Sequence, residues 1–195
     1  VRTVSGLKPV SVLWRRLDSA FADPLELRGD SRIGTSGLVD ALRHGTVAAV
    51  NAVGSGILET RALLAFLPQI ARARLGTELA LPSIATWWCG QDAERQHVID
   101  NLDSLMIGPA LSTRLAFEEE NLTVLGSSLK GKQRDAMLAR LAERGGTLVG
   151  QEAVTLSTTP VFINGWLEPR PASLRVYLAR TRDGWTVMPG GFARV

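Results

Sequence analysis

The sequence predicts an α/β protein whose C-terminal half has α+β character. In the first half, apolar β-branched runs alternate with segments whose apolar residues recur at helical spacing, the pattern of strands connected by helices. In the second half, short alternating runs are separated by Asn164-Gly165 and Asp183-Gly184, which are typical of tight hairpins. This change of pattern predicts two domains, over residues 1–102 and 103–195.

The first domain is expected to begin with a strand–helix–strand unit. Alternation of large apolar residues predicts a strand over residues 10–14. A helix over 37–45 follows, which we expect Ser36 to cap and Gly45 to end. Residues 46–53, "TVAAVNAV", are apolar without alternation, as in a strand covered on both faces.

Two helices and a further strand complete the expected elements. Residues 59–76 have helical spacing, and Pro68 is expected to kink or break that helix. In the second domain a helix over 127–146 precedes a strand over 147–156. Strand alternation then places Arg175 on the face opposite the apolar residues around it. The second domain is therefore expected to be an antiparallel sheet backed by a helix.

Composition indicates an ordinary globular protein. Of 195 residues, 45% are hydrophobic and 21% are charged, and the net charge is only +3 without a basic run. Scattered charge and 6% aromatic residues argue against a nucleic-acid surface, and no apolar run is long enough to span a bilayer, so we expect no membrane partner. Cys89 is the only cysteine, which excludes an internal disulfide and fits a cytoplasmic location.

Both ends of the sequence suggest a piece of a longer protein. It begins without Met. It ends on "MPGGFARV", a pattern typical of a loop and strand that continue beyond the last residue. We therefore expect the remainder of the same polypeptide to be a partner of this chain.

The loop Gly54-Ser55-Gly56 is the first candidate site. It lies between an expected strand and an expected helix, where glycines allow close backbone approach and free N–H groups can bind an anion. It lacks the Lys of a P-loop and the spacing of a dinucleotide fingerprint, so a plain strand-to-helix turn is the alternative. Asn51 and Glu59 flank it.

A second candidate is the dense mixture of charges between residues 15 and 32. Such carboxylates and guanidinium groups either bind metal and phosphate together or pair with one another at the surface. The residues concerned are Arg15, Arg16, Asp18, Asp23, Glu26, Arg28, Asp30 and Arg32.

Other polar residues favour structural roles. His44 and His97 are far apart in sequence, so a histidine metal site is not expected, and His44 is placed to interact with the end of its helix. The acidic stretch 117–121 is typical of a solvated turn. Cys89 lies in "WWCG", where the flanking tryptophans favour a buried edge over a nucleophile.

Several strings together resemble the circularly permuted ATP-grasp proteins, relatives of glutathionylspermidine synthetase, whose domains were formerly of unknown function. The resemblance runs from about residue 11 to the end and depends on the order and spacing of six strings: "RRLDSAFADPLELRGDSRIG", "NAVGSGILE", "FLP", "TWWCG", "LVGQEAVTLSTTP" and "MPGGFARV". It implies an ATP-grasp-like fold, incomplete in this chain, that binds ATP and Mg between two lobes. It also implies that an acyl-phosphate forms on a carboxylate and is attacked by an amine.

The resemblance also implies roles for individual residues. Arg16 would contact phosphate or a substrate carboxylate, Asp18 would assist metal or amine, and Arg194 would bind phosphate, with Arg175 as a further candidate. The residues expected to line the nucleotide cleft are Gln151, Glu152, Val154, Gly54, Ser55 and Gly56. No metal ligand is expected in this chain, because the family's ligands lie upstream of the segment that resembles "RRLD".

Two features depart from the family pattern. Gly108 stands where the resemblance implies a basic residue that reaches the ATP phosphates, and residues 112–121 are poor in glycine where a flexible loop would cover those phosphates. Arg114 is a possible replacement for the missing cation.

Three functional hypotheses follow. The first is a fragment of an ATP-dependent carboxylate–amine ligase that is inactive without the rest of the polypeptide, with a nucleotide and a small carboxylate or amine as partners. The second is a non-catalytic ATP-grasp-like binding or scaffold domain, which Gly108 supports. The third is an anion-binding α/β module that uses only the loop 54–56. A cation beside Gly108 that points at Arg194 would favour the ligase, and an apolar plug would favour the scaffold.

Overall fold

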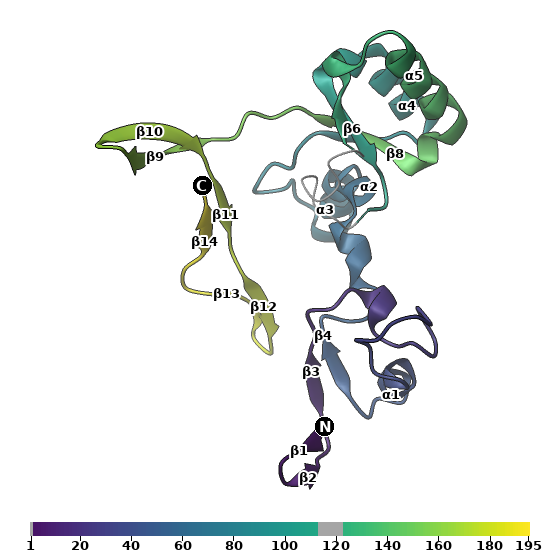
Figure 1. Cartoon of the computed structure of the whole chain (residues 1–195), viewed down its shortest axis with the longest axis vertical. Coiled ribbons are helices and arrows are strands. Elements are labelled where there is room, and N and C mark those ends of the chain that lie inside the picture. The colour runs from purple at the N-terminus through teal and green to yellow at the C-terminus, as the bar shows by residue number, and fades with distance from the viewer. Residues whose placement is uncertain (1, 113–122) are drawn as a thin grey trace. The chain divides into compact units, whose positions relative to one another are not determined.

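The computed structural model describes residues 2–112 and 123–195 (Figure 1). Arg114 and the acidic stretch 117–121 therefore lie outside the described residues, and so do the expectations placed on them.

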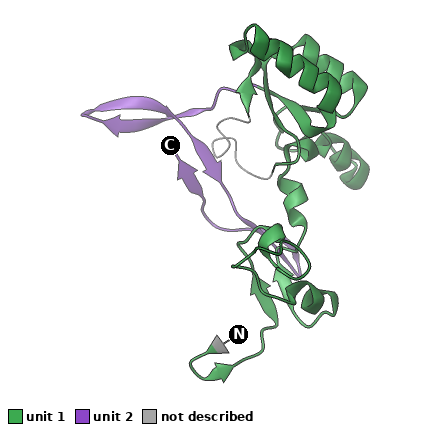
Figure 2. Cartoon of the chain, turned by 45° about the vertical axis from the view of Figure 1, so that its right-hand side comes forward, with its two compact units in different colours: residues 1–152 green, residues 153–195 purple. Residues whose placement is uncertain are grey.

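Two compact units divide the chain, residues 1–152 and residues 153–195 (Figure 2). The boundary expected near residue 102 falls within the first unit. There β8 (Leu148–Glu152) pairs with β5 (Thr86–Trp88), so one sheet contains strands from both sides of that point. A functional division at residue 102 stays a prediction.

The first unit begins with the expected strand–helix–strand order. Strands β3 (Val12–Trp14) and β4 (Ala48–Val50) pair in parallel, and α1 (Leu38–Arg43) lies between them in the chain. The expectation that the second strand is covered on both faces was wrong, because β4 pairs only with β3 and Val50 is 48% exposed.

The start of α1 differs from the sequence prediction. Ser36 does not cap the helix; the N-cap position is Gly37, in the left-handed region at φ 80°. The side chain of Asp23 instead accepts hydrogen bonds from the amides of Gly37 (3.2 Å) and Val39 (2.9 Å). A carboxylate remote in sequence thus satisfies amides that have no partner inside the helix.

Pro68 separates two helices, as its sequence position predicts. Helix α2 (Arg61–Leu64) ends before it, and α3 (Leu67–Leu75) carries it within its first turn, where a missing N–H costs nothing. The amide of Ala62 donates to the carbonyl oxygen of Ala110, which fixes the start of α2 to the chain that leaves β6 (Leu105–Pro109).

The core of the first unit is a four-stranded antiparallel sheet with the order β5-β8-β6-β7, where β7 is Val124–Leu125. Helices α4 (Asp92–Asp100) and α5 (Lys132–Arg144) contribute the side chains that pack against it. The fully buried cluster consists of Cys89, Val98, Leu102, Leu105, Ile107, Leu141 and Leu148. This sheet, backed by a helix, confirms the arrangement expected around residues 127–156.

The second unit consists of hairpins and paired strands, and none of its residues is buried. Asn164 and Gly165 both have positive φ, at 50° and 89°, and form the predicted turn of one hairpin. A second hairpin forms as predicted near Asp183-Gly184, but its two turn residues are Arg182 and Asp183, and Gly184 is already paired with Thr181. The strands are β9 (Thr158–Ile163), β10 (Trp166–Pro171), β11 (Ser173–Arg175), β12 (Leu178–Thr181), β13 (Gly184–Val187) and β14 (Phe192–Arg194).

The remaining elements of the described chain are short. They are β1 (Arg2–Thr3), β2 (Gly6–Leu7), η1 (Ser19–Phe21), η2 (Ser55–Glu59), η3 (Leu102–Ser104), η5 (Gly126–Ser128) and η6 (Gly145–Thr147).

Candidate functional site

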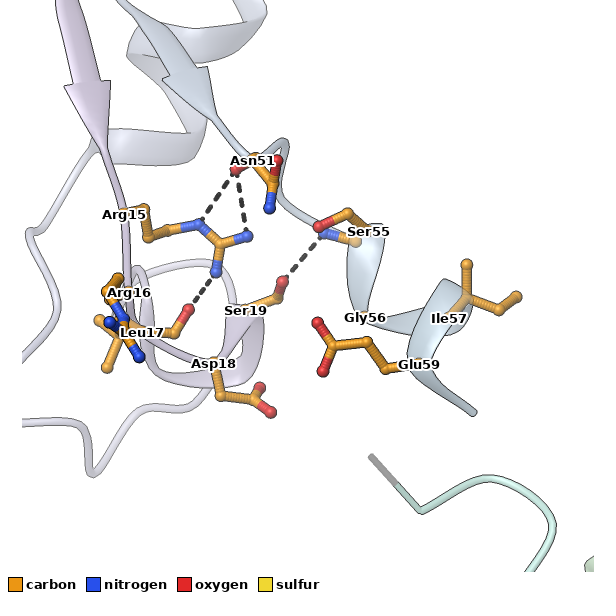
Figure 3. A pocket seen from close by; sticks show the side chains of 11 residues that line it. Arg15, Arg16, Leu17, Asp18, Ser19, Asn51, Ser55, Gly56, Ile57 and Glu59 are labelled. Carbon is orange, nitrogen blue, oxygen red and sulfur yellow. Dashed lines mark hydrogen bonds between the residues drawn. The ribbon is translucent and has the colours of Figure 1, made fainter. Parts of the chain in front are cut away.

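Two of the predicted segments come together around one cavity of about 620 Å³ (Figure 3). One segment follows β3, and the other follows β4. Because β3 and β4 are parallel, their carboxyl ends lie at the same edge, the usual position of binding loops in an open α/β sheet. The lining residues are Arg15, Arg16, Leu17, Asp18, Ser19, Asn51, Gly54, Ser55, Gly56, Ile57 and Glu59.

Arg15 holds the two segments together. Its guanidinium group donates to the carbonyl oxygens of Asn51 (3.2 and 3.3 Å) and Ala52 (2.8 Å), and also to that of Leu17. The backbone amide of Arg15 donates to Val50 O at 2.7 Å. Since these carbonyl groups use its donors, Arg15 positions the cavity wall. The sequence presented it only as one of several clustered arginines.

The glycine loop lies at the cavity, but its first amides are already engaged. Gly54 N donates to Ser19 Oγ at 3.0 Å, and Ser55 N donates to Ala52 O at 3.2 Å. Gly54 has φ 91°, a conformation that glycine adopts without steric cost. The η2 helix that follows is a single short turn. Gly54, Ser55 and Gly56 therefore line a cavity, and their role in binding a cofactor stays a prediction.

Three charged side chains surround this cavity in addition to Arg15. Figure 3 shows the carboxylates of Asp18 and Glu59 on facing sides of the space between the two segments, and Arg16 also lines the cavity. Asp18 also accepts a hydrogen bond of 2.9 Å from Ala20 N and thereby caps η1. With Arg15 and Arg16 in the same lining, the cavity has a mixed charge.

Most of the other charged residues between positions 15 and 32 have structural partners. Arg28 pairs with Asp30 at 2.7 Å, and Glu26 pairs with Arg43 of α1 at 2.6 Å. Asp23 is buried and caps α1, and the hydrogen bonds from backbone amides, that of Val39 above all, hold the pKa of its carboxyl below its usual value. These contacts support mutual pairing over a joint metal and phosphate site.

Gln151 and Glu152 lie on β8, which is paired on both sides. Gln151 is opposite Thr86 of β5 and opposite Met106 of β6, and its Nε2 donates to Thr86 Oγ1 at 3.1 Å. Glu152 N donates to Ala85 O at 2.9 Å. The backbone amide and carbonyl groups of β8 are engaged in hydrogen bonds with β5 and β6. Any backbone contact with adenine would therefore come from the residues after the strand, towards Val154. The base-binding role of these residues stays a prediction.

A cation occupies the space beside Gly108. A Cβ atom on this buried glycine would overlap the guanidinium group of Arg61, whose Nη1 donates to Thr123 Oγ1 at 2.8 Å. Arg61 begins α2, which the sequence did not single out. An arginine side chain thus lies where a side chain at position 108 would begin. Arg194 belongs to the other unit.

Arg175 and Arg194 lie on the same face of one strand pair. In the register of β11 and β14, Arg175 is opposite Phe192, and Arg194 is two residues further along β14. Directly opposed residues and residues two apart share a face of a sheet, so the two arginines are diagonal neighbours. This pair of cations on one surface is suited to an anion with several charged oxygens.

Cys89 is a core residue, as its flanking tryptophans predict. It is completely buried, and burial raises the pKa of the Cys89 thiol to about 11. His44 lies with its Nδ1 3.0 Å from the carbonyl oxygen of Asp40, in agreement with a role at its helix end. His97 stacks on Trp87 with ring centroids 4.5 Å apart.

Within residues 2–112 and 123–195, no three His, Cys, Asp or Glu side chains are grouped so that they could hold a metal ion. Among the helices that the structure describes, none has the length and apolar character needed to cross a membrane.

The chain belongs to the family of circularly permuted ATP-grasp type 2 proteins, whose family model matches residues 1–195. This membership confirms the expected fold class and the resemblance on which the site expectations depend.

Related proteins are considerably longer. An uncharacterized protein of Mycobacterium tuberculosis is 36% identical over 195 residues, which is all of this chain but 21% of that protein. An uncharacterized protein of Synechocystis is 32% identical over 196 residues, or 40% of its length, and one of Mycobacterium leprae is 31% identical over 193 residues, or 34% of its length. The chain therefore spans between a fifth and two fifths of these relatives.

Proposed function

We propose that the chain is the part of an ATP-dependent carboxylate–amine ligase that contributes phosphate-binding cations and one substrate cavity. The ligase would make an amide or peptide-like bond, and ATP, when bound, would supply the phosphoryl group that activates the carboxylate. The chain alone is proposed to be inactive, since it covers only 21% of a longer relative.

The observation that carries this proposal is the shared face of Arg175 and Arg194 in a chain of the ATP-grasp family. Two guanidinium groups that are diagonal neighbours provide bidentate donors for phosphate oxygens, and such donors stabilise the charge that develops during phosphoryl transfer. These two residues would hold the triphosphate of ATP, and Arg16 would contact phosphate or a substrate carboxylate.

Arg61 weakens the main support of the scaffold hypothesis. The scaffold hypothesis depends on a missing cation at position 108, yet the guanidinium of Arg61 fills that space. Loss of a desolvated cation near a triphosphate would raise the free energy of binding or of the transition state by several kcal/mol, about the effect of removing one stabilising donor. Because Arg61 retains a positive charge there, Gly108 alone does not argue for a lapsed active site.

The experiment is a comparison of ADP release by this chain and by the longer polypeptide that contains it. With Mg-ATP, we expect the longer polypeptide to release ADP when mixtures of carboxylates and of primary amines are both supplied, and Arg194→Ala to reduce the rate by about a hundredfold. Arg170→Ala is the matched control, because Arg170 lies on another hairpin and pairs with Glu168 at 2.8 Å.

The scaffold hypothesis makes the opposite prediction. It expects no substrate-dependent ADP release from a folded longer polypeptide with any mixture. ADP release by the 195-residue chain alone would contradict the proposal that this part is inactive by itself.

A further inference from the structure

We infer that one face of the β3–β4 pair is an interaction surface, and that a helix with an apolar stripe, from the part of the longer polypeptide outside these 195 residues, packs on it. The face consists of Val12, Trp14, Ala48 and Val50 and is called the Trp14 face below. This inference goes beyond the proposed function, because it concerns packing and needs neither ATP nor turnover.

The Trp14 face is apolar over the whole length of the strand pair. In the parallel register Val12 lies beside Ala48 and Trp14 lies beside Val50, so the four side chains share one side of the pair. Trp14 is 77% exposed and Val12 is 59% exposed, and neither strand contains a charged residue. Aromatic side chains dominate the energetics of packing, and a contiguous exposed apolar patch is typical of an interaction site.

The other face of the pair is better covered. Leu13 and Ala49 alternate with the exposed residues and are half-buried. Helix α1 connects β3 to β4, and one such crossover helix covers one face of a parallel pair (Figure 1). Parallel strands occur almost only in sheets with both faces covered. In the described part of the first unit, the Trp14 face therefore lacks the layer that a parallel pair requires.

Two observations identify the missing layer as a helix from outside this chain. The faces of parallel sheets are covered by helices, because the connections between parallel strands are usually helical. All of this chain corresponds to only 21% of a longer relative, so the longer polypeptide has ample length for such a helix. An apolar helical stripe matches an uncharged face, whereas a charged segment would lose its hydration there without an ionic partner.

The test measures the accessibility of a thiol placed on the Trp14 face. Val12→Cys is alkylated with iodoacetamide in the 195-residue chain and in the longer polypeptide, and mass spectrometry follows the labelled peptide. We expect rapid labelling in the 195-residue chain and labelling at least about tenfold slower in the longer polypeptide. Ala139→Cys, at an exposed position of α5, is the matched control and should be labelled at similar rates in both. The buried Cys89 gives the rate for a protected thiol.

A charged substitution tests whether the face is packed. We expect Val12→Glu to lower the Tm of the longer polypeptide by at least about 4 °C, because the carboxylate would be buried against the helix. The same change should alter the Tm of the 195-residue chain by less than about 1 °C, since the position is exposed there. Ala139→Glu is the control and should have the small effect in both. Failure of only the Val12→Glu polypeptide to fold would also support the inference.

Three outcomes would overturn the inference. Equal labelling of Val12→Cys in the two chains would show that the face stays open. Slow labelling in the 195-residue chain would show that this chain covers its own face, or that a second copy does if the rate falls with protein concentration. Equal Tm losses from Val12→Glu in both chains would show a role within the strand pair. None of these measurements contains a nucleotide, so failure here leaves the proposed function standing.

Discussion

The guanidinium group of Arg61 lies in the space that a side chain at position 108 would occupy, and its Nη1 donates a 2.8 Å hydrogen bond to Thr123 Oγ1. The absence of a side chain on Gly108 thus allows an arginine from α2 to lie against the buried strand β6. In the sequence, Gly108 indicates that a basic residue has been lost. In the structure, Gly108 is contacted by the guanidinium group of Arg61 from α2.

Gly108→Ala is expected to displace Arg61 and to lower the free energy of unfolding by about 1–2 kcal/mol, the usual cost of adding a methyl group to a packed site. Urea unfolding measures this loss. In the Arg61→Met background the same alanine should cost less, with a coupling of about 1 kcal/mol in a double-mutant cycle. Equal costs in both backgrounds would show that Arg61 does not depend on the glycine.

Asp23→Ala is expected to lower Tm by about 5 °C, because three amides, those of Leu25, Gly37 and Val39, lose their acceptor. Differential scanning calorimetry measures the change. Glu26→Ala provides a matched control, since Glu26 is exposed and its loss removes only a surface ion pair with Arg43.

The contribution of Asp23 also has a defined pH dependence. Hydrogen bonds from backbone amides lower its pKa in the folded chain below the ordinary value of 3.8. The unfolded chain therefore binds the proton first as the pH falls, so the stabilisation is fully present above that value and is lost as the pH falls through the lower pKa of the folded state. The Tm difference between wild type and Asp23→Ala should shrink in that acid range. A difference independent of pH down to the acid limit would contradict this assignment.

Cys89 is expected to resist alkylation in the folded chain. With its pKa raised to about 11 by burial, its thiolate fraction at pH 8 is more than about a hundredfold below that of an ordinary cysteine. Iodoacetamide labelling followed by mass spectrometry should therefore be at least about a hundredfold slower in buffer than in urea. Rapid labelling of the folded chain would contradict a structural role in the core.

Arg15→Gln is expected to separate the two segments around the cavity and to lower the free energy of unfolding by about 1–2 kcal/mol, since charged hydrogen bonds to Asn51 O and Ala52 O are lost. Urea unfolding, together with the amide spectrum of residues 51–56, measures both effects. Arg16→Gln is the control, because Arg16 is the next residue in the chain and is exposed. Similar spectra for the two variants would show that Arg15 is not the brace of this cavity.

Local signals predicted much of the fold. Pro68 divides two helices, Asn164-Gly165 forms a hairpin turn, and strands form at β3 and β4, because each depends on dihedral preference or on periodicity within a few residues. Helix α4 was not predicted, since its only fully buried residue is Val98 and its pattern carries little apolar periodicity.

The unpredicted features of the site depend on contacts that are remote in sequence. Asp23 caps a helix that begins 15 residues later, Arg15 braces carbonyl groups 36 and 37 residues away, and Arg61 reaches the strand that contains Gly108. No spacing rule connects such residues. The sequence identified Arg16, Asp18 and the glycine loop as candidate site residues, and these line one cavity. Their roles in catalysis and binding stay predictions.

The most direct test of the central claim, that this chain carries phosphate-binding cations of a nucleotide site, is calorimetric titration of Mg-ATP into the 195-residue chain, the longer polypeptide, and the Arg194→Ala and Arg170→Ala variants of each. We predict weak or no measurable binding to the 195-residue chain and saturable binding to the longer polypeptide. Arg194→Ala should weaken that binding by at least about tenfold, and Arg170→Ala should leave it within about twofold. An absence of heat from a folded longer polypeptide, or equal affinities for the two variants, would contradict the claim.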